Sequence, residues 1–170
     1  DAGRDRRLMI LGHFDEDLLP EDLQDRVETH AFTTYDAYLE TLARADCAVM
    51  PLHDDLFNSC KSAVRVIDAA AVGVPSVVGL VGDMSNVVRN GETGFVVDDA
   101  KGWRTALETL AGDPKLVKSL GKAARADQAG HRRDGGRVIA LRRGDAAAQQ
   151  LGTAIVHGQH LDLGAPQIDT

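Results

Sequence analysis

The sequence predicts a doubly wound α/β fold built on a parallel sheet. Short apolar runs recur along the chain without alternating with polar residues, which is typical of strands buried on both faces. Segments with helical periodicity separate these runs, and strand–helix alternation indicates parallel strands covered by helices. The 170 residues are 44% hydrophobic and 26% charged, and these globular proportions exclude wholesale disorder.

The apolar runs predict five strands. In chain order they cover residues 8–12, 30–32, 47–52, 76–80 and 94–97. Gly12 closes the first strand, and Asn90-Gly91 forms a turn ahead of the last. Doubly wound sheets bind ligands at the carboxyl ends of their strands. The loops after Gly12, Phe32, Leu52 and Leu80 are therefore the places to expect a site.

Helices are predicted between and after the strands, over 20–27, 36–45, 59–72, 84–89, 99–111 and 114–127. Pro20 and Pro114 suit first helical positions because a first-turn N–H needs no helical partner. Gly73 with Pro75 ends the helix at 59–72. Asp98 or Asp99 caps the fifth helix.

The chain divides into a domain at 1–127 and a weakly structured tail at 128–170. The tail contains no Phe, Trp or Tyr and is rich in Gly and Arg. Residues 146–156 have the composition of a helix, with little apolar surface to accompany it. The first residue is not Met, and we take the chain to be a fragment or a processed product.

Charge and composition narrow the possible partners. A net charge of −7 and a pI near 5.3 give no general attraction to nucleic acid or anionic lipid. Cys47 and Cys60 do not make a disulfide framework, and no apolar run approaches the ~20 residues that a membrane span needs. We therefore expect a cytoplasmic protein with no transmembrane segment and no nucleic-acid partner.

The helix predicted at 59–72 carries the most informative charges. Lys61, Arg65 and Asp68 are spaced by four and three residues, which places them on one face of an otherwise apolar helix. Lys61 would lie in the first turn, where a cation is unfavourable by ~0.3–1 kcal/mol unless an anion is bound. Helix amides, Ser62 and Lys61 together suit a phosphate, and the Asp68 carboxylate suits sugar hydroxyls. These groups describe a nucleoside diphosphate site.

A structural interpretation of the same charges stays open at this stage. The three side chains would also suit an ordinary solvated stripe, with Arg65 and Asp68 paired at i, i+3 for a few tenths of a kcal/mol. Charge clusters mark sites only probabilistically, so the residues alone do not separate the two interpretations.

The order of several motifs resembles the C-terminal, donor-binding domain of GT-B glycosyltransferases of the nucleotide-sugar-dependent group 1 type. The resemblance covers about residues 8–126 and includes the strand at 8–12, the stretch 43–52 and the hairpin at 90–97. Its signature stretch runs from Phe57-Asn58 through Lys61-Ser62, Arg65 and Asp68 to Gly73-Val74-Pro75. It implies an incomplete Rossmann-like C-terminal domain, whose parent enzyme would have an N-terminal acceptor domain.

The resemblance also assigns roles to residues. It implies that Asp68 binds the donor ribose, that Lys61 and Ser62 meet the phosphates or sugar, and that Asn58 and Arg65 belong to the donor site. Lys61 would be the catalytic residue, by stabilising the leaving diphosphate. The family has Glu where this chain has Asp68, and Cys60 stands where a first acidic residue is common. No cofactor is implied beyond the nucleoside diphosphate sugar, which is the donor substrate.

The function that follows is the donor-binding half of an enzyme transferring a sugar to a glycan, lipid or cell-surface polysaccharide precursor. On its own this half is expected to be inactive, and any peripheral membrane contact would come from the missing domain. The alternative is a non-catalytic α/β module that binds a nucleotide or a partner.

Other polar groups are weaker candidates. His13 follows the first strand, and a lone loop histidine is usually solvated. The contiguous His53, Asp54 and Asp55 do not converge on a metal, and we expect none. Gly79 to Asp83 suits a plain strand-to-helix turn, and Trp103 suits packing.

Overall fold

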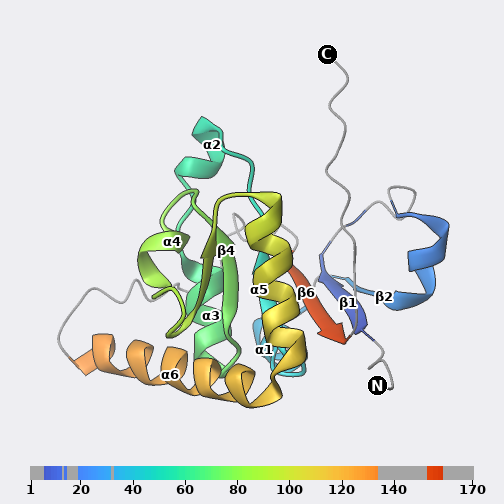
Figure 1. Cartoon of the computed structure of the whole chain (residues 1–170). Helices are drawn as coiled ribbons and strands as arrows, with labels where there is room; N and C mark the ends of the chain where they lie inside the picture. Colours follow the sequence, from blue (N-terminus) through green and yellow to red (C-terminus); the bar gives the residue numbers. More distant parts are fainter. Residues whose placement is uncertain (1–5, 13, 15–18, 32, 134–152, 159–170) are drawn as a thin grey trace.

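The computed structural model describes residues 6–12, 14, 19–31, 33–133 and 153–158 and contains a six-stranded sheet of order β2-β1-β6-β3-β4-β5. The strands are β1 (Arg6–Leu11), β2 (Val27–His30), β3 (Cys47–Met50), β4 (Ser76–Gly79), β5 (Gly94–Val97) and β6 (Thr153–Gly158). The helices are η2 (Glu21–Arg26), α1 (Tyr35–Leu42), α2 (Leu56–Ser59), α3 (Val64–Ala71), α4 (Met84–Val87), α5 (Ala100–Gly112) and α6 (Pro114–Arg133). In Figure 1, α5 lies on the viewer's side of the sheet, with α6 along its lower end and α2 at the upper end.

Four of the five predicted strands are confirmed as β1, β3, β4 and β5, and the second is shifted, since β2 begins at Val27, which was predicted to end a helix. These five strands pair in parallel as expected. β1 pairs with β2, and β4 pairs with β3 on one side and β5 on the other. The second strand ends at His30 rather than reaching Phe32, and Phe32 and His13 lie outside the described residues. The α/β fold class is therefore confirmed.

β6 departs from the predicted all-parallel sheet. It lies between β1 and β3 and is antiparallel to both. The helix expected over 146–156 is therefore wrong for its last residues, which form a strand, because pairing with both neighbours decides their conformation. α6 also continues to Arg133, past the predicted boundary at 127. Most of the tail, 134–152 and 159–170, lies outside the described residues, so the division into domain and tail stays a prediction.

Each face of the sheet has its own apolar core. Side chains of β3 alternate between the two, because successive residues of a strand point to opposite faces. Ala48 and Met50 pack in the core covered by α1, α3 and α4. Cys47 and Val49 pack in the core covered by α5 and α6, where Trp103 also packs, as predicted. Both faces are covered, which explains why the strands are continuously apolar.

α5 and α6 begin where the sequence predicts. The Asp99 side chain accepts a hydrogen bond from the Gly102 amide (2.6 Å), so Asp99 rather than Asp98 is the cap. Asp113 accepts from the amides of Lys115 and Leu116, with Pro114 as the first residue of α6. An Arg89–Asp127 ion pair (2.8 Å) links α6 to the segment after α4.

The residues that the structure describes include no helix with both the length and the apolar character needed to span a bilayer.

Candidate functional site

The chain between β3 and α3 does not form the single helix that the sequence predicts. The Asp55 carboxylate caps α2 by accepting from the Asn58 amide (2.7 Å), and α2 ends at Ser59. α3 begins only at Val64. Between them, the Lys61 carbonyl oxygen accepts a hydrogen bond from the Asp83 amide (3.2 Å), which belongs to the loop after β4 and not to a helix containing Lys61. The predicted start at Ser59 is therefore wrong, and Lys61 and Ser62 lie in a loop.

Because α3 begins at Val64, the cation in its first turn is Arg65 and not Lys61. Ala63 precedes the helix and offers no side-chain cap to the first-turn amides. A cation beside this positive helix end is unfavourable by ~0.3–1 kcal/mol. Burial lowers the pKa of the Arg65 guanidinium, and Tyr38 opposes that effect. The argument for an anion at this helix end therefore now depends on Arg65.

Lys61 lies close enough to Arg65 to feel its charge. The Lys61 Nζ is 4.7 Å from the centroid of the Phe57 ring, a cation–π contact. Burial lowers the pKa of Lys61, the charge of Arg65 lowers it further, and Asp55 raises it. Two neighbouring cations repel each other, and an anion bound between them would relieve that repulsion.

Asp68 is buried, with 7% of its surface exposed. Its Oδ1 accepts a hydrogen bond of 2.7 Å from the Tyr35 hydroxyl on α1. Burial raises the pKa of the Asp68 carboxyl, and the bond from Tyr35 acts in the opposite direction. A buried carboxylate held by a neighbouring helix is not part of a solvated stripe, so that alternative is wrong for Asp68.

Tyr35 and Tyr38 are the contributors that the sequence analysis missed. Their rings stack with centroids 6.1 Å apart, and they adjoin Asp68 and Arg65 respectively. The chain has only two tyrosines, and both lie on the first turn of α1. The presence of both tyrosines within four residues was the sequence feature that could have indicated their role. We call Tyr35, Tyr38, Lys61, Arg65 and Asp68 the α1–α3 cluster.

The two remaining predicted residues lie beside this cluster. The Asn58 side chain donates from Nδ2 to Asp55 Oδ2 (2.7 Å), so it supports the cap of α2. Ser62 is exposed in the loop immediately before α3. Neither role in donor binding is tested by these contacts.

The loop after β4 packs closely against the segment that carries Lys61. Gly82 has φ +67°, and a Cβ at this position would lie 2.8 Å from the Asn58 carbonyl oxygen and 3.1 Å from that of Lys61. Only glycine permits this backbone conformation and this close an approach at low cost. Gly82 thus fixes the position of the segment that carries Lys61, which a plain turn would not do.

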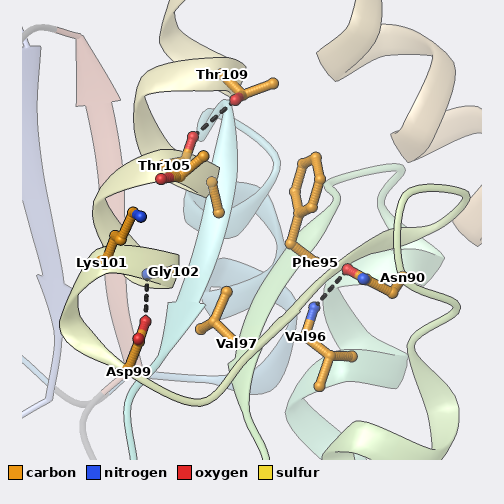
Figure 2. A pocket seen from close by; sticks show the side chains of 10 residues that line it. Asn90, Phe95, Val96, Val97, Asp99, Lys101, Gly102, Thr105 and Thr109 are labelled. Atoms are coloured by element: carbon orange, nitrogen blue, oxygen red, sulfur yellow. Dashed lines mark hydrogen bonds between the residues drawn. The ribbon is translucent and has the colours of Figure 1, made fainter.

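The other candidates have structural roles or no visible role. Asp55 caps α2, and no group of three or more His, Cys, Asp or Glu side chains within the described ranges is placed to hold a metal ion. A hollow of about 340 Å³ lies beside β5 and α5. Figure 2 shows the side chains that line it, Phe95, Lys101 and Thr105 among them. It shares no residue with the α1–α3 cluster.

Comparison with known proteins gives a family match over most of the described domain. The sequence model described as "Glycosyl transferases group 1" matches residues 2–113. D-inositol 3-phosphate glycosyltransferase of Rhodococcus jostii is 31% identical over 91 residues, which are 52% of this chain and 19% of that protein. Glycogen synthase of Mycobacterium tuberculosis is 34% identical over 89 residues, 51% and 20% respectively. The matched region thus spans about a fifth of these relatives.

Solved structures show a similar fold. Sucrose-phosphate synthase from Thermosynechococcus elongatus has a TM-score of 0.52 at 24% identity, over 64% of this chain and 27% of that one. Anabaena HepE in complex with UDP-glucose has a TM-score of 0.52 at 20% identity, over 64% and 29%. The C-terminal domain of LpcC, a group 1 family glycosyl transferase from Francisella tularensis, has a TM-score of 0.50 at 17% identity, over 65% and 56%.

Proposed function

Because this chain belongs to the group 1 glycosyl transferases, we propose that it is the donor-binding half of an enzyme that transfers a sugar from a nucleoside diphosphate sugar to an acceptor. The observation that carries the proposal is the α1–α3 cluster. It combines a buried carboxylate with two neighbouring cations at the uncapped start of α3. α3 itself follows the carboxyl end of β3, the side on which doubly wound sheets bind ligands.

The cations suit the diphosphate. Arg65 and Lys61 would bind its oxygens together with the first-turn amides of α3, since a helix start attracts anions. Sugar transfer breaks the bond between the sugar and the diphosphate, and negative charge grows on the departing oxygen. Fixed positive groups around that oxygen lower the barrier. Lys61 is the proposed catalytic residue, and Arg65 is proposed to stabilise the same negative charge.

The carboxylate suits the nucleoside. Asp68 accepts hydrogen bonds when ionised, and the ribose hydroxyls donate them. Hydrogen bonds to a charged group contribute about 1.5–3 kcal/mol each, more than those between neutral groups. Asn58 and Ser62 complete the proposed donor site beside the cations.

The acceptor is proposed only by class. The relatives carry the names of an inositol phosphate glycosyltransferase and a glycogen synthase. We propose that the acceptor is a glycan, a lipid or a cell-surface polysaccharide precursor, and that an N-terminal acceptor domain is the partner of this half. The proposed site uses no cofactor, so donor binding should survive chelation by EDTA.

Calorimetric titration with UDP tests the proposal, since HepE was solved with UDP-glucose and with UDP. Lys61→Ala and Arg65→Ala should each weaken UDP binding by ~1–3 kcal/mol, as for the loss of a charge-assisted hydrogen bond. Lys101→Ala is the matched control, because Lys101 is exposed on α5 beside the other hollow. No binding of UDP, ADP or GDP to the wild type would refute the proposal, and an effect confined to Lys101→Ala would move the site to that hollow.

A further inference from the structure

The Asp68 carboxylate is held by a residue 33 positions earlier in the chain. Tyr35, in the first turn of α1, donates its hydroxyl hydrogen to Asp68 Oδ1 at 2.7 Å. The other oxygen, Oδ2, belongs to the same carboxylate and can also accept hydrogen bonds when the group is ionised. One oxygen is thus anchored to α1, and the second can accept from a further donor.

An anchored carboxylate is a better receptor for a diol than a rotating one. Rotation of the carboxylate about its χ2 angle is broad, so a free Asp side chain must give up that freedom when it binds. The bond from Tyr35 fixes the rotation before the ligand arrives. It also favours the charged form, which is the form that accepts hydrogen bonds from hydroxyls.

The Tyr35 ring itself contributes little to the core. The residue is 59% exposed, and its ring stacks on that of the more buried Tyr38. An exposed tyrosine whose hydroxyl reaches a buried carboxylate is more readily explained by that hydrogen bond than by packing. Tyr38 would then support the ring that carries the hydroxyl.

We propose that Tyr35 is a positioning residue that makes the donor site select ribose over 2′-deoxyribose, by fixing Asp68 for the vicinal hydroxyls. The inference rests on the proposed function, because it takes Asp68 as the ribose-binding carboxylate. It adds a residue on α1 to a site otherwise built by α3 and the loop before it.

The experiment compares a nucleoside diphosphate with its 2′-deoxy form by calorimetry on the full chain. UDP and 2′-deoxy-UDP are the first pair, and ADP or GDP replaces UDP if it binds more tightly. The wild type should prefer the ribose form by roughly 10-fold or more, the effect of one hydrogen bond to a charged group. Tyr35→Phe should reduce the preference to roughly 3-fold or less, mainly by weakening the ribose form. Thr41→Val, which removes a different hydroxyl from α1, one that donates to the Ala37 carbonyl oxygen at 2.8 Å, should retain the wild-type ratio.

A second measurement separates positioning from a structural role. Tyr35 from α1 is the titratable group that contacts Asp68, and Arg65 stands three residues earlier on the same helix. Losing the Tyr35 bond should move the acid limb of ligand binding to higher pH. Tyr35→Leu should give the same ratio and pH profile as Tyr35→Phe, provided thermal unfolding shows both variants folded.

The outcomes distinguish the two proposals. If the wild type binds no nucleoside diphosphate, the proposed function fails and this inference fails with it. If it binds ribose and deoxyribose forms equally, or if Tyr35→Phe keeps the wild-type ratio, the inference on Tyr35 is overturned while the donor site stands.

Discussion

Gly82→Ala should damage the site through backbone packing without removing any side chain from it. The glycine has φ +67°, where an L-residue costs about 1–2 kcal/mol. Its new Cβ would lie 2.8 Å from the Asn58 carbonyl oxygen, against 3.4 Å for ordinary contact. The segment from Asn58 to Lys61 would then have to retreat by about 0.6 Å, and over-packing of this kind costs about 1–3 kcal/mol.

Gly91→Ala separates the two contributions. Gly91 has φ +77° but nothing within 4 Å of the position of a Cβ. It should therefore lose about 1–2 kcal/mol of unfolding free energy from the backbone conformation alone. Gly82→Ala should lose about 2–5 kcal/mol, the sum of the backbone and contact costs.

The two variants should also differ in ligand binding. Displacement of Lys61 should weaken UDP binding roughly 10-fold in Gly82→Ala, which corresponds to 1.4 kcal/mol, and Gly91→Ala should bind as the wild type does. Urea unfolding gives the stabilities, and calorimetry gives the affinities. Equal stability losses would show that the close approach is absent, and wild-type affinity in a folded Gly82→Ala would show that this loop does not set the diphosphate site.

Two further predictions concern the stability of the fold. Asp68→Asn should raise the melting temperature at pH 7. Burial raises the pKa of Asp68 above its ordinary 3.8, so the folded state loses stability as the pH rises from 3.8 through the pKa of the folded state. Asn carries no charge and avoids that loss. In thermal melts, the melting temperature of the variant should fall less than that of the wild type as the pH rises above 3.8. A lower melting temperature than the wild type at pH 7 would contradict the argument. Gly121→Ala should cost ~3 kcal/mol or more in urea unfolding, since its Cβ would clash with the Gly73 carbonyl oxygen, a backbone atom that cannot rotate away. Gly112→Ala, with nothing within 4 Å, is the control and should gain ~0.5–1 kcal/mol.

Most of the fold could be predicted because its signals are local. A strand buried on both faces must be apolar throughout, and β3, β4 and β5 were found from that requirement. The starts of α5 and α6 were found from Asp99 and Pro114, since capping is decided by residues next to the helix. β6 was missed because its conformation depends on pairing with β1 and β3, which are more than 100 residues earlier in the chain.

The candidate site was predicted in part, and the missing parts are tertiary. The spacing of Lys61, Arg65 and Asp68 fits one helix as well as it fits a loop followed by a helix. The difference is made by the bond from the Asp83 amide to the Lys61 carbonyl, which joins residues 22 positions apart. The Tyr35–Asp68 hydrogen bond joins residues 33 positions apart. Spacing within one segment cannot reveal either contact.

The corrected start of α3 divides the site into a fixed part and an adjustable part. Arg65 and Asp68 project from one helix at i, i+3, so their separation is set by helix geometry and by the packing of α1. Lys61 belongs to a loop, and its ammonium rests on the exposed Phe57 ring, a contact worth about 0.5–1 kcal/mol at such a site. A diphosphate offers a charge-assisted hydrogen bond of about 1.5–3 kcal/mol, so it would draw Lys61 away from the ring. The helix would therefore recognise the nucleoside diphosphate first, and Lys61 would bind it afterwards, which would place the cation of the loop where the leaving-group charge develops.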